Sequence, residues 1–441
     1  MASTLFRDAT ILTMNDAWEV VHGDVYVADG RIAAVGAIPT GARPDSTIDA
    51  GGLIVLPGFV QTHIHVCQTL FRGLAEDLPL LEWLRRRVWP LEAAHDDRTL
   101  GVAARLAAAE LQLGGTTTVL TMETVHGTAA VFDALAPTGL RATIGKCLMD
   151  VRGEAPARLY QPAREGLDET LALQKQWSAS ANGRLRAALA PRFALSCTRE
   201  LLEATAAASV EHDLLVHTHA SEQRDEIALV RAQTGLDNVA YFASIGLATH
   251  RLCAAHCVWV TDAEQQLLAE HRVKVLHCPG SNLKLGSGIA PVPEMRARGI
   301  GVSIGADGAA CNNTLDMFYE MRLAASLQAM RRGPGALPAR DVVAMATREG
   351  ARALGLEHEI GSIQVGKKAD LVLVETREPH QSPGPDPYAR LVFASRASDV
   401  RLTMVDGVVV ARDGQIAWGD RARIAHEANE TARTLIGRAG I

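Results

Sequence analysis

Several histidine and carboxylate side chains stand at the ends of short apolar runs, where they could share one site. His63 and His65 are two residues apart, so on a β-strand both imidazoles point to the same side. The other residues of this kind are His217, His219, Glu222, His256, His277 and Asp307. Nitrogen and carboxylate ligands around an open site favour Zn²⁺ or Fe²⁺. The pattern therefore predicts a divalent metal centre, and a metal that lowers the pKa of water favours hydrolysis.

The elements that position these residues alternate along the middle of the chain. Between about residue 57 and about residue 356, apolar runs are separated by helical stretches rich in Ala, Leu, Glu and Arg. The expected strands are 54–60, 117–120, 141–148, 185–189, 214–217, 252–255, 274–277 and 301–304. Eight alternating units in roughly 300 residues predict an α/β fold, a closed (β/α)8 barrel with its functional residues at the carboxyl ends of the strands. An open doubly wound sheet is the alternative, but neither phosphate-loop motif that would support it is present.

Both ends of the chain are rich in short strands separated by Asp-Gly turns. The dipeptides at 29–30, 406–407 and 413–414 are hairpin signals between β-rich runs. Neither end is long enough to build a core of its own, so we expect the two to fold together. The predicted division is a small β-rich, sandwich-like domain made of residues 1–57 and 360–441, and a catalytic barrel over residues 58–359.

Composition narrows the class of protein. The 441 residues carry a net charge of -6 and no dense block of Lys and Arg, which argues against nucleic acid as a partner. No apolar run is long enough to cross a membrane, and we expect no signal peptide. The seven cysteines are scattered without a C-x-x-C pair, which favours reduced thiols in the cytoplasm. These features predict a cytoplasmic protein whose partners are neither nucleic acid nor a membrane.

One stretch of the chain resembles the first-strand signature of the amidohydrolase superfamily, above all that of its nucleobase and nucleoside deaminase branch: Pro57-Gly58-Phe59-Val60-Gln61-Thr62-His63-Ile64-His65. The segments that are similar to the same branch, in the same order, are 75–84, 281–288, 307–313 and 366–371. The resemblance therefore covers almost the whole chain.

The resemblance implies a role for each residue of the predicted site. One ion, Zn²⁺ or alternatively Fe²⁺, would be held by His63, His65, His219 and the catalytic Asp307. Glu222 would shuttle protons between the attacking water and a ring nitrogen, and His256 would orient that water. Two-metal relatives carry a Lys in the fourth strand, and residues 184–191 contain none, so one ion is expected. The implied reaction is a deamination in which water attacks an amino-bearing ring carbon and ammonia leaves.

Spacing leaves the roles of two further histidines open. His217 and His219 face the same side of a strand, so either could be a ligand; the resemblance favours His219. His217 is then expected behind a ligand or beside the substrate, and His277 beside the substrate. Trp83, in segment 75–84, is a further expected substrate contact.

The identity of the heterocycle stays open because two groups of deaminases are resembled at once. Gln68 and segments 146–150 and 191–197 are similar to guanine deaminases, in which the residues that match Gln68 and Arg192 hold the polar edge of the purine. Arg192 could instead pair with a carboxylate. Segment 281–313 is similar to deaminases of S-adenosylhomocysteine, methylthioadenosine and 5′-deoxyadenosine.

We therefore expect an aminopurine as substrate, either guanine or a 5′-modified adenosine. Triazine hydrolases share parts of the pattern, so an aminohydrolase of triazines, pterins or isocytosine, or a chlorohydrolase, is the alternative. An inactive barrel that serves as a binding scaffold is the non-enzymatic alternative, but every expected ligand and Glu222 are present. We also expect a homodimer or a higher homo-oligomer.

Overall fold

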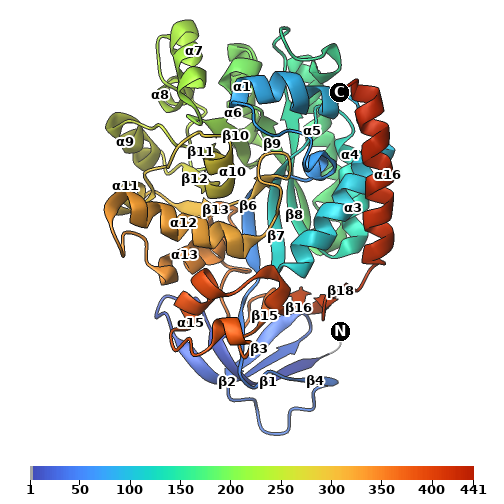
Figure 1. Cartoon of the computed structure of the whole chain (residues 1–441), viewed down its shortest axis with the longest axis vertical. Helices are drawn as coiled ribbons and strands as arrows, with labels where there is room; N and C mark the ends of the chain where they lie inside the picture. The colour runs from blue at the N-terminus through green and yellow to red at the C-terminus, as the bar shows by residue number, and fades with distance from the viewer. Residues whose placement is uncertain (1–2) are drawn as a thin grey trace.

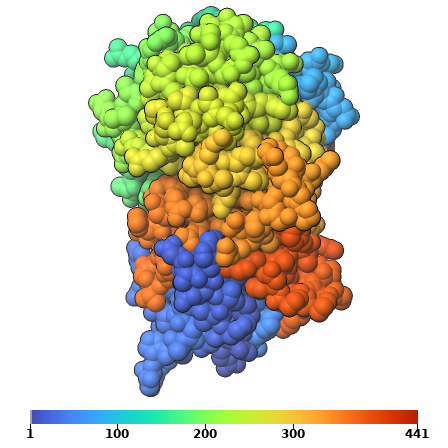
Figure 2. All heavy atoms as spheres, turned by 90° about the vertical axis from the view of Figure 1, so that its left-hand side faces the viewer, coloured from blue at the N-terminus to red at the C-terminus, as the bar shows by residue number. Residues whose placement is uncertain are grey.

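Two β-sheets of nine strands each organise the chain, which the computed structural model describes over residues 3–441. One sheet is the barrel, and the other is a smaller module at one end of the molecule (Figure 1). In the space-filling view the blue N-terminal residues form this end, and orange residues lie directly above them (Figure 2). No helix within residues 3–441 is long and apolar enough to cross a membrane.

The barrel is a closed ring of parallel strands. Its strands are β6 (Phe59–His65), β7 (Thr116–Met122), β8 (Arg141–Leu148), β9 (Leu185–Pro191), β10 (Val216–Ala220), β11 (Leu252–His256), β12 (Lys274–His277), β13 (Val302–Ile304) and β14 (Asp307–Gly308). From β6 to β13 each strand pairs in parallel with the next, and β14 pairs in parallel with β6 on the other side. Strands β13 and β14 are thus two halves of the eighth strand, and the predicted (β/α)8 barrel is confirmed.

A glycine lets the two halves of the eighth strand come close to β6. A Cβ atom on Gly305 would lie 2.5 Å from the backbone nitrogen and oxygen of His63. Such a contact is shorter than real side chains make, so the position requires glycine. The backbone that carries Asp307 is therefore held directly against the strand that carries His63 and His65.

Helices surround the barrel. They are α3 (Asp97–Leu113), α4 (Thr128–Leu135), α5 (Ala163–Trp177), α6 (Arg199–Glu211), α7 (Arg224–Thr234), α8 (Asn238–Ser244), α9 (Asp262–Glu270), α11 (Val292–Ala297), α12 (Met317–Arg332), α13 (Ala339–Ala346) and α14 (Arg348–Ala353). Helix α3 begins where its sequence provides an N-terminal cap, because Asp96 and Thr99 form a capping box. Its buried face carries Ala104, Ala107 and Ala108 at helical spacing. Such small side chains let a helix lie close to its neighbours.

Short helical elements follow the first strand near the mouth of the barrel. They are η1 (Val66–Phe71), α1 (Leu80–Trp83), η2 (Leu84–Val88) and α2 (Trp89–Ala93), joined later by α10 (Pro279–Lys284). Helix α1 lies at the end of the molecule opposite the small sheet (Figure 1). These elements therefore surround the carboxyl ends of the barrel strands.

The second sheet is built from both ends of the chain, as predicted. Its strands are β1 (Thr4–Leu12), β2 (Val20–Ala28), β3 (Arg31–Gly36), β4 (Ser46–Asp49), β5 (Leu53–Pro57), β15 (Leu371–Glu375), β16 (Val400–Val405), β17 (Val408–Arg412) and β18 (Gln415–Ile416). The antiparallel pair of β5 with β15 joins the N-terminal strands to the C-terminal strands. A buried ion pair ties this module to the barrel, because Arg141 on β8 donates to both carboxylate oxygens of Asp370, at 3.0 and 3.1 Å.

Two expectations about these elements differ from the structure. The single strand predicted at 54–60 is wrong, because the run divides at Gly58 into β5 of the small sheet and β6 of the barrel. Both parts are fully buried, so their apolar pattern does not mark the division. The segment 360–441 was expected to belong to the β module, but it also contains the short α15 (Pro387–Ala389) and the long α16 (Arg421–Ala439). Helix α16 packs along α3 of the barrel (Figure 1).

Candidate metal centre and active site

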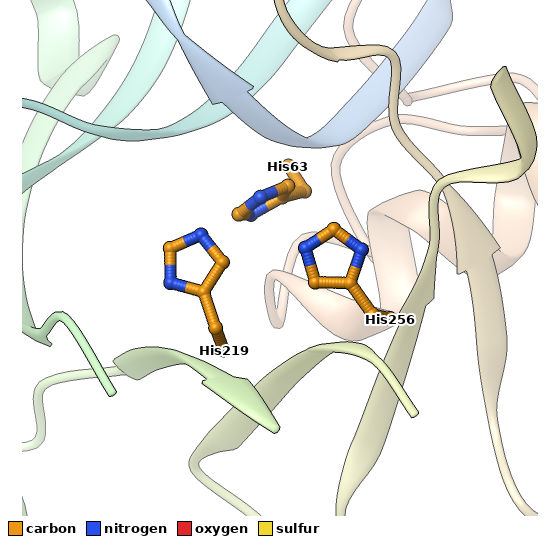
Figure 3. A group of neighbouring side chains, drawn as sticks. All are labelled: His63, His219 and His256. Atoms are coloured by element: carbon orange, nitrogen blue, oxygen red, sulfur yellow. The ribbon is translucent and has the colours of Figure 1, made fainter. Parts of the chain in front are cut away.

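Three imidazoles and one carboxylate converge at the carboxyl ends of β6, β10 and the eighth strand. The Nε2 atoms of His63 and His65 each lie 3.2 Å from Oδ1 of Asp307. Nε2 of His219 lies 3.3 Å from Nε2 of His65. The ligand atoms form two overlapping groups, each within 4.8 Å: His63 with His65 and Asp307, and His63 with His219 and His256 (Figure 3).

Hydrogen bonds to backbone carbonyls determine which nitrogen of each ring carries the proton. Nδ1 of His65 lies 2.8 Å from the carbonyl oxygen of Met122, and Nδ1 of His219 lies 2.6 Å from that of Arg192. A carbonyl oxygen only accepts, so both Nδ1 atoms donate. Since burial lowers the pKa of His219 well below its usual range, its ring is neutral and its Nε2 carries a lone pair.

The tautomer of His63 follows from its hydrogen bond to His217. Nδ1 of His217 donates to the carbonyl oxygen of Thr121 at 3.1 Å, which leaves its Nε2 as an acceptor. Nδ1 of His63 lies 2.6 Å from that acceptor and must donate. Burial lowers the pKa of both rings, that of His63 to about 4, so both are neutral. Nε2 of His63 is therefore a free lone pair as well.

This arrangement fits a divalent cation. The lone pairs of the Nε2 atoms and of the Asp307 carboxylate face one another at 3.2–3.3 Å, where they repel unless a cation lies among them. Nε2 of His63 is buried and has no hydrogen-bond partner within residues 3–441. Neutral imidazole and ionised carboxylate are the forms that bind metal.

Two further predicted residues stand beside the cluster. Nε2 of His256 lies 3.6 Å from Oε2 of Glu222 and 3.8 Å from Oδ2 of Asp307. Burial would lower the pKa of His256, but the two carboxylates raise it above its usual value. Burial raises the pKa of Glu222 to about 7, so this carboxyl can take up and release a proton near neutral pH.

Neighbours that the sequence analysis did not single out orient this pair. Asn282 on α10 lies with Oδ1 2.8 Å from Nδ1 of His256. The carboxylate of Glu226 accepts the backbone N–H of Glu222 at 2.8 Å. Glu226 is the N3 residue of a capping box at the start of α7, which is a local signal, whereas Asn282 reaches His256 from an element 26 residues away in the sequence. Their contacts fix the direction in which His256 and Glu222 point.

Three non-glycine residues at the site have left-handed backbone conformations. The φ angles are 52° at Ser221, 70° at His256 and 65° at Asp307. Side chains disfavour this region, and such residues gather at functional sites where surrounding structure holds them. Ser221 directly follows β10, His256 ends β11 and Asp307 begins β14, so all three lie where barrel strands meet the site.

A cavity lies above the cluster, and three of the predicted substrate-binding residues line it. Its lining includes Gln68, Trp83 and Arg192, together with Glu222 and His256. Oε1 of Gln68 and Nε1 of Trp83 are buried and have no hydrogen-bond partner in the described part of the chain. An acceptor and a donor are thus available on the cavity wall.

Arg192 is held by a carboxylate that the sequence analysis missed. Its two terminal nitrogens donate to Glu92 at 2.5 and 3.1 Å, and Nε2 of Gln68 donates to the same carboxylate at 2.9 Å. All three side chains are buried. An acidic residue on the buried face of a helix requires a partner, and Glu92 on α2 is such a residue. Its partner, Arg192, is 100 residues away in the sequence, so the sequence alone does not identify it.

The other two predicted substrate residues are not among those that line the cavity. His217 lies behind His63, with both nitrogens engaged. His277 is buried at the end of β12, and neither of its nitrogens has a hydrogen-bond partner among residues 3–441. Burial lowers the pKa of His277 to about 3, so its ring is neutral.

The barrel, the converging imidazoles and the adjacent carboxyl group define a metal-dependent hydrolase. Comparison with known proteins agrees with this class, since the model of the amidohydrolase family matches residues 54–410. The chain belongs to that family. It is 41% identical over 438 residues to a protein of Desulforudis audaxviator named 5-methylthioadenosine/S-adenosylhomocysteine deaminase, covering 98% of this chain and 99% of the relative.

Further comparisons cover nearly the whole chain. A Methanothermobacter thermautotrophicus protein named 5′-deoxyadenosine deaminase is 39% identical over 425 residues, with 96% of this chain and 97% of the relative covered. Among solved structures, an adenosine deaminase from Xanthomonas campestris with bound zinc superposes with a TM-score of 0.93 at 32% identity, covering 99% of both chains.

Proposed function

We propose that this protein is a zinc-dependent deaminase of an aminopurine. One Zn²⁺ ion would be held by Nε2 of His63, His65 and His219 and by the carboxylate of Asp307. The observation that carries the proposal is the set of opposed lone pairs beside Glu222. A single ion is favoured because β9, the fourth barrel strand, contains no Lys. When bound, such an ion lowers the pKa of a water molecule and supplies a nucleophile at neutral pH.

The residues around the ion then divide the proton transfers between them. Glu222 takes a proton from the attacking water and gives it to the ring nitrogen next to the amino-bearing carbon. His256, oriented by Asn282, donates a hydrogen bond that directs the water toward that carbon. Glu222 then takes the remaining proton from the hydroxyl group now on the ring carbon and passes it to the amino group as the carbon–nitrogen bond breaks. Ammonia leaves, and the ring carbon becomes a carbonyl.

The substrate class that we propose first is a 5′-modified adenosine. It is supported by relatives that share 37–41% of their residues over almost their full length and that are named for deamination of methylthioadenosine, S-adenosylhomocysteine or 5′-deoxyadenosine. The unpartnered Oε1 of Gln68 and Nε1 of Trp83 could bind the ring edges of such a base.

Guanine is a second candidate, favoured by the guanidinium of Arg192 on the cavity wall. Guanine presents a carbonyl oxygen, and a guanidinium is a strong donor to such an acceptor. Against this use, Glu92 occupies both terminal nitrogens of Arg192. The carbonyl oxygen of guanine would have to accept a hydrogen bond from a remaining N–H of Arg192, or replace one carboxylate oxygen of Glu92 as its acceptor.

Ammonia release tests the proposal directly. Purified enzyme loaded with Zn²⁺ should release ammonia from 5′-deoxyadenosine, methylthioadenosine or S-adenosylhomocysteine, or from guanine. Glu222→Gln keeps the size of the side chain but cannot cycle a proton, so turnover should fall about a hundredfold or more with metal content unchanged. Turnover of a triazine, a pterin or isocytosine alone would overturn the aminopurine part. No turnover of any compound would favour a binding scaffold.

The cellular setting and the assembly are also proposals. All seven cysteines are buried and free, which supports a reducing compartment such as the cytoplasm. A homodimer or a higher homo-oligomer remains our prediction, and the molar mass of the purified protein in solution tests it.

A further inference from the structure

Five of the side chains that line the cavity above the metal cluster are apolar. Leu80 and Leu84 from α1 and η2, Phe193 after β9 and Leu285 after α10 line it together with Trp83. All five belong to one apolar cluster. We call these five side chains the roof.

The space that the roof leaves is too small for a substrate. The cavity measures only ≈ 30 Å³. Pockets that hold small-molecule ligands typically measure about 300–1,000 Å³. A heterocycle therefore enters only when part of the roof moves, and α1 with η2 contributes three of the five roof residues.

A polar cluster beside the roof joins three segments that lie far apart in the sequence. Nζ of Lys284 lies 2.8 Å from Oε2 of Glu76. Nδ2 of Asn313 donates to Oε1 of Glu76 at 3.1 Å, and Nζ of Lys284 donates to Oδ1 of Asn313. Lys284 also donates to the carbonyl oxygen of Ala310 at 3.3 Å. The three side chains close a ring of interactions in which each one contacts the other two.

The position of this ring relates it to the roof. Glu76 lies in the loop that leads into α1, and Lys284 directly precedes the roof residue Leu285. Asn313 lies in the loop that follows Asp307 and the eighth strand. The ring thus connects three segments: the loop before α1, the end of α10 and the loop that follows β14. Partial burial would raise the pKa of Glu76, but its bonds to Lys284 and Asn313 lower it, so this carboxyl is ionised.

We propose that Glu76, Lys284 and Asn313 form a latch that holds α1 and η2 closed over the substrate cavity. The loop before α1 contains Gly73 with a left-handed φ of 76° and open space around it, which provides a hinge. Release of the latch lets α1 and η2 swing away, and its closure excludes water once the substrate is bound. The three are positioning residues that act through the roof. The inference rests on the proposed function only in treating this cavity as the substrate site.

Hydrogen exchange of the roof segment tests the latch without any substrate. Glu76→Gln keeps the shape but removes the charge, and Lys284→Met removes the partner. In the full-length protein each substitution should speed exchange of the backbone amides of residues 80–88 about two- to fivefold, the range that one partly exposed ion pair supports. The double variant should be no faster than the faster single variant, because both changes break the same interaction.

Asp213→Asn is the matched control. Asp213 precedes β10 and pairs with Arg251 at 2.8 Å, as closely as Glu76 pairs with Lys284 but outside the roof, so its loss should leave exchange of residues 80–88 at the wild-type rate. Peptides from β1 to β3 should exchange as in wild type in every variant, which excludes general destabilisation. The latch is overturned if Glu76→Gln leaves exchange of residues 80–88 unchanged, or if Asp213→Asn speeds it equally. Neither result depends on which heterocycle is deaminated.

Discussion

His217 illustrates how one buried residue prepares another for metal binding. Its Nε2 accepts a hydrogen bond from Nδ1 of His63, and its Nδ1 donates one to the carbonyl oxygen of Thr121. Residues that hold a ligand in this way typically change metal affinity about 10–100-fold when they are lost. We therefore predict such a loss for His217→Leu, measured by competition for zinc with a chelator. His217→Gln keeps an acceptor and should lose less.

His277→Leu is the control for that experiment. His277 is equally buried in the same barrel, but none of its nitrogens bonds to a proposed ligand. Its loss should leave zinc affinity unchanged. Equal losses for both leucine variants would mean that general packing, and not the orientation of His63, sets the affinity.

Arg192 requires a test that separates stability from substrate binding. Arg192→Met alone leaves Glu92 as an unpaired buried charge, which costs about 3–5 kcal/mol of stability. The double variant Arg192→Met with Glu92→Gln removes both charges and should recover most of that loss. If Arg192 binds guanine, kcat/KM for guanine should fall at least about tenfold in the double variant. The value for 5′-deoxyadenosine should then change much less.

At the scale of elements, features with a local sequence pattern can be predicted from the sequence. Contacts between elements that are distant in the sequence cannot. The alternation of strands and helices predicts the barrel, and the spacing of His63 and His65 on one strand predicts their convergence. The division at Gly58 is missed because both flanking runs are buried and apolar. Glu92 and Glu76 are missed because their partners lie on elements that only the fold brings near. Helix pattern likewise does not reveal that α16 packs on α3.

Glu320 on α12 connects elements that support the site, and it predicts a pH dependence. Its carboxyl accepts the backbone N–H of Gly280 at 3.0 Å and Nδ2 of Asn312 at 2.8 Å. Burial raises its pKa to about 8. In the unfolded chain a Glu titrates at about 4.3, so between these values the native state binds more protons than the unfolded state. This contribution to stability is fully present below the unfolded pKa and is lost as pH rises through the folded pKa.

Glu320→Gln removes that titration. The Tm of wild type should fall relative to that of the variant as pH rises from 5 to 8. The lost acceptor adds a constant difference in Tm, which is already present at low pH. Thermal unfolding of both proteins at several pH values in this range measures the difference. Parallel curves would show that Glu320 is ionised in the native state throughout.

At the scale of the whole molecule, the C-terminal segment supports both parts of the protein. Strand β15 pairs with β5, and Leu371, Leu373 and Leu402 pack in one cluster with apolar residues of the N-terminal strands. Beyond that sheet, α16 packs on α3, α2 and η1, and Leu435 belongs to the apolar cluster that contains the roof. The segment therefore contributes to the small module and, separately, to the region around the site.

Two truncations separate these contributions. Removal of residues 360–441 should give insoluble protein, because β5 loses its antiparallel partner and apolar side chains of the N-terminal strands become exposed. Removal of residues 420–441 alone keeps the sheet, so the product should stay soluble. Its Tm should fall, and residues 80–88 should exchange faster, because α16 no longer packs on α2 and η1. A soluble, active product of the longer truncation would contradict the dependence of the N-terminal strands on β15.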